Sequence, residues 1–242
     1  MNIIQISWIL STVSNIIFLF VFIPQFLENY RTKSSDAISI YLIISWVIGN
    51  GLIILTSAFI DLNMIVLFVA IYQLTLDLLF LAQLVYYRIY ALKQNEQDYL
   101  FIQDKLYNII KDVIFTFIYL VIISILILAL TISNIDNNYI AQILGWVATG
   151  VFICARLPQI FLNYQRKSVE GLSLMTFFFV CFANGLFLGS IFIQLIGKTH
   201  DEQWNYLLIN SPWIASNSIT SLFDIVIFIQ FFIYKQNPIE II

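Results

Sequence analysis

The chain has 242 residues and a mass of 28.1 kDa, with 61% hydrophobic residues, 10% charged residues and a mean hydropathy of +0.91. Ordinary soluble domains are roughly 45–50% apolar and about 25% charged, so this composition excludes a soluble globular protein. A formal net charge of -3 with thinly spread basic residues excludes a nucleic-acid-binding protein, and two cysteines exclude a disulfide framework. The sequence therefore predicts an integral membrane protein.

Seven stretches are apolar and long enough to cross a bilayer, which needs about 20 residues per helix. In chain order they cover residues 6–27, 38–60, 64–87, 113–133, 140–162, 172–196 and 206–234. We interpret residues 91–112 as a polar connector and residues 235–242 as a tail. No basic residue precedes the first stretch, so we expect it to be retained as a span rather than cleaved as a signal peptide.

The distribution of Lys and Arg outside the spans predicts the orientation, because basic residues concentrate on the cytosolic side of a membrane. Nine fall on one side of the predicted topology, whereas only Lys198 falls on the other. We therefore expect a lumenal or extracellular N-terminus and a cytosolic C-terminus. The nine are Arg31, Lys33, Arg88, Lys93, Lys105, Lys111, Arg166, Lys167 and Lys235.

The chain contains an internal repeat. Residues 22–39 (FIPQFLENYRTKSSDAIS) align without gaps with residues 156–173 (RLPQIFLNYQRKSVEGLS), with seven identical positions at an offset of 134. Farther along, at an offset of 147, Asp77 and Gln83 correspond to Asp224 and Gln230. The pattern predicts two repeats of three helices that run in the same direction, at 1–90 and 140–234, joined by a linker helix at 113–133.

These residues resemble the PQ-loop repeat, a family that includes cystinosin, the lysosomal and vacuolar cationic amino acid exporters and, more distantly, the SWEET sugar transporters. Within the family, the sequence ARLPQ at 155–159 and KSVEGLS at 167–173 are most similar to the cationic amino acid branch. The resemblance implies an all-α membrane protein with two parallel three-helix bundles around a midplane site. It also implies gradient-driven transport across a lysosomal or vacuolar membrane.

The paired Pro-Gln motifs are candidate hinges. Proline removes a backbone hydrogen bond inside a helix, so Pro24 and Pro158 should kink the first and fifth spans, although prolines are also common in membrane helices for other reasons. We expect the neighbouring amides of Gln25 and Gln159 to satisfy the carbonyl groups that the prolines leave unpaired.

Two carboxylates lie in the middle of predicted spans, where an ionised group is costly and therefore faces protein or water. Asp224 lies on one helical face with Asn217, Thr220 and Ser221, and this polar stripe is predicted to line a cavity. Asp224 is the first candidate for proton exchange or cation binding. A fixed ion pair or a hydrogen bond between helices is the alternative for Asp224 and equally for Asp77.

Arg156, Asn184 and Asn50 are further candidates for the substrate path. Arg156 needs an anionic partner, for which Asp224 and Asp77 are candidates. Two roles stay open for it: contact with a substrate carboxylate, and snorkelling to the cytosolic interface. In the family, the helices of Asn50 and Asn184 face the central path; the alternative role of both side chains is hydrogen bonding between helices. Asn50 stands where amino acid transporters of the family often have an aspartate, which argues against a strictly cationic substrate.

No phosphate-binding loop, metal-ligand spacing or activated nucleophile is found in the sequence, so we expect neither an enzyme nor a cofactor. The predicted partners are the lipid bilayer and a small polar solute, with protons as a candidate coupling ion and no nucleic acid. The predicted function is transport of an amino acid by rocking about the Pro-Gln motifs. Two alternatives remain open: an accessory subunit or receptor in a larger membrane complex, and a sugar facilitator.

Overall fold

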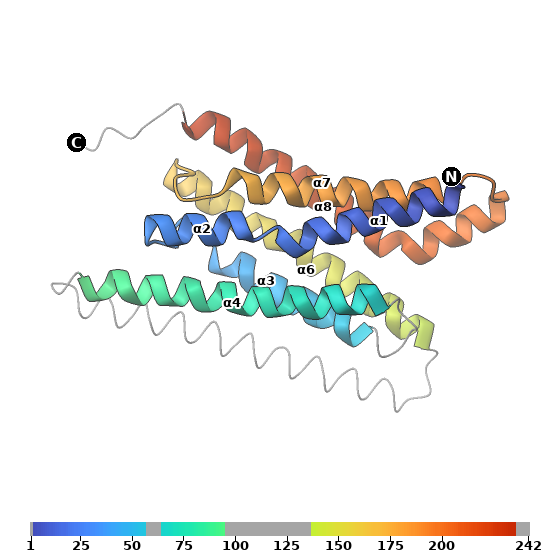
Figure 1. Ribbon diagram of the computed structural model, residues 1–242, viewed down its shortest axis with the longest axis horizontal. Helices are drawn as coiled ribbons and strands as arrows, with labels where there is room; N and C mark the ends of the chain where they lie inside the picture. The colour runs from blue at the N-terminus through green and yellow to red at the C-terminus, as the bar shows by residue number, and fades with distance from the viewer. Residues whose placement is uncertain (1, 57–63, 95–136, 236–242) are drawn as a thin grey trace.

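The computed structural model describes residues 2–56, 64–94 and 137–235, and all regular structure in these ranges is helical (Figure 1). Most of the predicted connector, the predicted linker helix at 113–133 and the tail beyond Lys235 lie outside the described residues. The helices are α1 (Ile3–Phe20), α2 (Ile23–Thr32), α3 (Ile40–Thr56), α4 (Met64–Gln94), α6 (Asn137–Arg166), α7 (Leu174–Ile193) and α8 (His200–Lys235).

Five segments of the described chain are long and apolar enough to span a membrane: α1 together with α2, α4, α6, α7 and α8. The remaining helix, α3, is apolar but has only 17 residues. The described ranges thus contain helical segments at six of the seven predicted spans, of which five are long and apolar enough to cross a membrane.

The first span is broken into two helices. The break falls at Val21 and Phe22, and Pro24 follows at the start of α2, where its missing N–H needs no helical partner. In the second repeat, α6 continues through Pro158 without interruption. Only the first of the two predicted kinks therefore coincides with a break in the helix.

These six helical segments form a ring. The third helix of each repeat lies between the first two: α4 contacts α1 and α3, and α8 contacts α6 and α7. Across the repeats, α1 packs along α7 and α3 packs along α6, so the order around the ring is α1, α7, α8, α6, α3 and α4. The contact between α1 and α4 is much less extensive than the equivalent contact between α6 and α8.

Small side chains allow the close approach of helices from different repeats. The hydroxyl groups of Ser7 and Ser14 in α1 donate hydrogen bonds of 2.8 Å to the carbonyl oxygens of Ser190 and Ala183 in α7. Such contacts hold membrane helices together where no hydrophobic driving force acts between them.

The apolar core lies toward the end of the molecule that carries both Pro-Gln motifs, which we call the PQ end (Figure 1). It includes aliphatic residues of the loops that follow α2 and α6, together with aromatic side chains of the helices. The core closes the bundle at the PQ end. Its most buried members include Val21, Ile38, Leu42, Ile43, Phe80, Leu84, Phe177 and Ile227.

Candidate functional site

Each Pro-Gln glutamine binds the loop of the opposite repeat. We call these loops, residues 33–39 and 167–173, the PQ loops. The side chain of Gln25 donates to the carbonyl oxygen of Gly171 (2.9 Å) and accepts from the backbone N–H of Ser173 (2.6 Å).

The second glutamine makes the equivalent pair of bonds. Gln159 donates to the carbonyl oxygen of Ala37 and accepts from the N–H of Ser39, both at 2.8 Å. The expectation that these amides satisfy carbonyl groups freed by their own prolines is wrong. They hold the two repeats to each other instead, because the unpaired backbone groups of the opposite loop are within their reach.

A second layer of amides fixes each glutamine. Gln25 donates to the side-chain oxygen of Asn29, and Asn29 donates to Gln83 in α4. The repeat-equivalent residues make the same chain: Gln159 donates to Asn163, and Asn163 donates to Gln230 in α8. We call each glutamine with its loop contacts and supporting amides a clamp. The three amides of one clamp occupy the positions equivalent to the three amides of the other, so the two clamps follow the internal repeat of the sequence.

The PQ loops meet where the symmetry axis of the two repeats would pass. Gly171 has a φ of +80°, and a Cβ atom placed on it would lie 3.2 Å from the Cβ of Ala37. Ala37 is the residue equivalent to Gly171 at the offset of 134. Contact between two equivalent residues is expected only close to a two-fold axis. The axis therefore enters the molecule at the PQ end.

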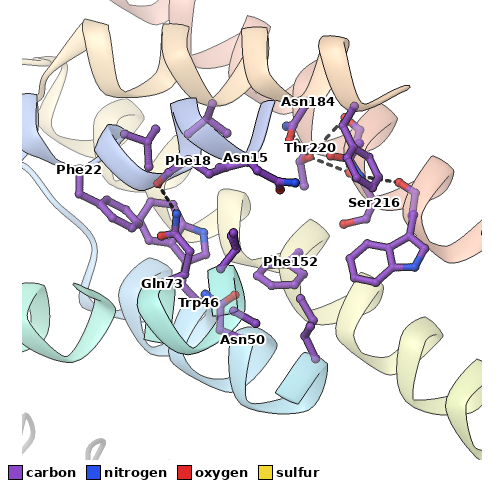
Figure 2. Close-up of a pocket in the computed structure, with 18 of the residues that line it drawn as sticks. Asn15, Phe18, Phe22, Trp46, Asn50, Gln73, Phe152, Asn184, Ser216 and Thr220 are labelled. Atoms are coloured by element: carbon purple, nitrogen blue, oxygen red, sulfur yellow. Dashed lines mark hydrogen bonds between the residues drawn. The ribbon is translucent and has the colours of Figure 1, made fainter. Parts of the chain in front are cut away.

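A cavity of about 370 Å³ lies between the two repeats, on the other side of the core from the PQ loops. Figure 2 shows aromatic and amide side chains converging on it from several helices of both repeats. A second cavity of about 190 Å³, between α3, α6 and α8, shares five lining residues with the first: Ile53, Phe152, Asn210, Trp213 and Ser216. It includes Thr56, the last residue of α3, and therefore extends away from the PQ end.

Arg156 and Asp224 form a buried ion pair beside the larger cavity. The Nε atom of Arg156 lies 2.8 Å from a carboxylate oxygen of Asp224, and the two side chains are 5% and 0% exposed. Burial and this contact exclude snorkelling of Arg156 to the interface. One atom of each partner, Nη1 of Arg156 and the second carboxylate oxygen of Asp224, has no hydrogen-bond partner among the described residues. Arg156 lines the cavity, whereas Asp224 lies behind it.

The other aspartate has a neutral partner. Asn50 donates a hydrogen bond of 2.7 Å to Asp77, which is completely buried and does not line the cavity. The two aspartates occupy equivalent positions but differ in their partners, because Phe22 stands in the first repeat where Arg156 stands in the second. Trp46 is close to both of these equivalent residues: its ring lies 5.0 Å from the Phe22 ring and 5.0 Å from the Arg156 guanidinium.

The predicted stripe on α8 only partly faces the cavity. Asn217 and Thr220 line it, whereas Ser221 and Asp224 do not. Asn50 and Asn184 also line it, and Asn184 donates to the hydroxyl of Thr220. The roles of these residues in a substrate path stay a prediction.

Several lining residues are not among those that the sequence predicts. Tryptophans in spans usually pack or mark the interface, yet Trp46 and Trp213 both line the cavity. Gln73 lines it too and donates to the carbonyl oxygen of Phe18 (Figure 2). No motif marks these residues, and only their depth within the predicted spans could have indicated them. Further lining residues are Asn15, Phe18, Phe152, Phe187, Asn210 and Ser216.

Comparison with known proteins agrees with this architecture. The PQ loop repeat matches twice, over residues 6–65 and 140–197. The chain is 25% identical to the vacuolar lysine transporter of Saccharomyces cerevisiae, with 96% of this chain and 94% of that protein covered. It is 24% identical to the vacuolar histidine transporter of the same yeast (98% and 94% covered) and 24% identical to the human lysosomal amino acid transporter 1 homolog (88% and 77% covered). The chain belongs to the PQ-loop repeat family, as its duplicated motif predicts.

Proposed function

We propose that this protein transports an amino acid across a vacuolar or lysosomal membrane by alternating access. The observation that carries the proposal is the combination of a cavity between two parallel repeats with a pair of equivalent clamps at one end. Full-length similarity to amino acid transporters of vacuoles and lysosomes supports the choice of cargo.

The geometry suggests how access would alternate. Both clamps join the same two repeats, so a rocking motion that opens the PQ end must break both of them. The lining of the smaller cavity reaches the end of α3 opposite the PQ loops. The described conformation thus corresponds to the state that is closed at the PQ end. The basic residues of the PQ loops and of the helix ends beside them support a cytosolic location for this end.

The finer parts of the proposal concern coupling and the hinge. The break at Val21 and Phe22 makes the first span the more flexible of the two Pro-Gln helices. The pair of Arg156 and Asp224 is the candidate group for proton coupling, because Arg156 lines the cavity and each partner has a buried polar atom with no hydrogen-bond partner among the described residues.

Counterflow in proteoliposomes tests the proposal. Purified protein would be reconstituted with an unlabelled amino acid inside, and accumulation of the same labelled amino acid would be followed over a panel of amino acids and sugars at two pH values. We expect accumulation of at least one amino acid, and none in liposomes that lack the protein. Accumulation of sugars alone, or of no solute, would contradict amino acid transport.

A further inference from the structure

The larger cavity combines one positive charge with a set of neutral oxygen acceptors. Arg156 is the charged residue among its described lining residues, and both buried aspartates lie outside the lining. The remaining polar side chains are amides and hydroxyls, and the rest are apolar or aromatic.

The lining asparagines use their N–H groups on other protein groups. Asn50, Asn184 and Asn217 each use their N–H groups on protein acceptors, at 2.7 Å, 3.3 Å and 2.7 Å respectively. No described residue donates a hydrogen bond to the side-chain oxygens of these three asparagines or of Gln73. An ammonium group donates three hydrogen bonds, and neutral oxygen acceptors of this kind can bind it without a counter-ion in direct contact.

Arg156 provides the complementary group for a carboxylate. Its Nη1 atom is buried without a hydrogen-bond partner among the described residues, although Nε is bound to Asp224. A guanidinium binds planar carboxylates well, and a buried donor without a partner is costly until an acceptor reaches it. Nη1 is closed off from solvent in the described conformation, so a cargo carboxylate would pair with this donor only after the guanidinium turns toward the cavity.

From these groups we infer that the cavity selects zwitterionic amino acids with an uncharged side chain over dibasic amino acids. The inference rests on the proposed transport function and names its substrate class. The carboxylate of the cargo would pair with Arg156, its ammonium would bind the amide oxygens, and its side chain would lie among the aromatic residues. The cationic side chain of a dibasic amino acid would find no carboxylate among the described lining residues. Neither aspartate lines the cavity: Asp77 is bound to Asn50 and Asp224 to Arg156.

Ligand binding to the purified full-length protein tests this inference without any variant. Leucine, leucinamide and lysine would compete against a labelled neutral amino acid, because leucinamide lacks the carboxylate and lysine adds a charge. We expect leucine to bind at least tenfold more tightly than either of the others. Tighter binding of lysine than of leucine would overturn the inference, and so would equal binding of leucine and leucinamide.

Variants assign the effect to residues. The double variant Arg156→Gln and Asp224→Asn removes both charges together, so the net charge of the pair stays at zero. It should abolish the preference for leucine over leucinamide. Asn50→Asp would place a carboxylate in the lining and should shift the ratio of lysine to leucine affinity at least tenfold toward lysine. Asp201→Asn is the control, because it removes a fully exposed carboxylate outside the lining and should leave that ratio within about threefold of the wild type. A collapse of the leucine preference in Asp201→Asn alone would contradict the assignment.

The binding and transport assays separate two failures. Leucine binding without counterflow of any amino acid would uphold the substrate class and refute transport. Counterflow of lysine with exclusion of leucine would uphold transport and refute the substrate class.

Discussion

Removing one clamp glutamine should open the PQ end by a calculable amount. Gln25 makes two hydrogen bonds to the opposite repeat, with the carbonyl of Gly171 and the N–H of Ser173. A net contribution of about 1 kcal/mol per bond gives about 2 kcal/mol for Gln25→Ala. Because 1.4 kcal/mol corresponds to a factor of ten, the ratio of open to closed molecules should rise about 30-fold. The same value is expected for Gln159→Ala, which loses the equivalent two bonds.

Distances between spin labels at the PQ end measure this ratio. Arg31 and Gln165 are exposed, occupy equivalent positions and lie just before the two PQ loops, so cysteines there would carry the labels. The native Cys154 and Cys181 would be replaced first, since neither is in a disulfide. Pulsed electron–electron double resonance should show one short distance in the wild type and a larger population at longer distance in each glutamine variant.

The control variant loses a side-chain hydrogen bond on the same helix, α2, that does not join the two repeats. Thr32 donates only to backbone oxygens of its own region, Glu28 and Ser34, so Thr32→Ala should leave the distance distribution unchanged. Both clamps span the same two bodies, so Gln25→Ala and Gln159→Ala should shift the same equilibrium by similar amounts. An unchanged distribution in both variants, or a large shift in one with none in the other, would refute the view of two equivalent clamps.

Two further predictions concern the cavity wall. A Cβ atom at Gly49 would lie 2.5 Å from the tip of the Phe152 ring, so Gly49→Ala should push this ring into the cavity and weaken cargo binding about tenfold. Gly185→Ala is the control in the same binding assay: its Cβ atom would meet nothing within 4 Å, and the affinity should stay unchanged. Asp224→Asn leaves Arg156 buried without its counter-ion, so unfolding in detergent should show a loss of about 3–5 kcal/mol, much of which the added substitution Arg156→Gln should restore; an equal loss in the double variant would argue against the ion pair as the cause.

The sequence was sufficient to predict the elements that depend on local composition and on the duplication. Apolar length predicts the six described helical segments, five of which are long and apolar enough to span a membrane, and the offset of 134 correctly pairs Gln25 with Gln159. What the glutamines bind could not be predicted, because their partners are backbone groups 146 and 122 residues away. A backbone carbonyl has no signature in the sequence, whatever residue carries it.

The cavity lining was less accessible to prediction for a different reason. In a membrane span, an aromatic residue that packs in the core and one that lines a cavity have the same neighbours in sequence and the same hydropathy. Trp46 does both: it belongs to the apolar core and faces the cavity. The stripe on α8 shows the same limit for polar residues, because helical spacing places Asn217 and Asp224 on one side of the helix but does not distinguish the cavity from the space behind it.

The two repeats are alike where they move against each other and different where they would hold a cargo. At the PQ end, every clamp residue has an equivalent partner, as a rocking motion about a two-fold axis requires. At the cavity, Phe22 is opposed to Arg156, although both lie 5.0 Å from Trp46. The proposed cargo carries a carboxylate at one side of its α-carbon and an ammonium at the other, so it has no two-fold axis. A site that binds it on the axis between the repeats must therefore break their symmetry, and the substitution of an arginine for a phenylalanine does so with a single charge.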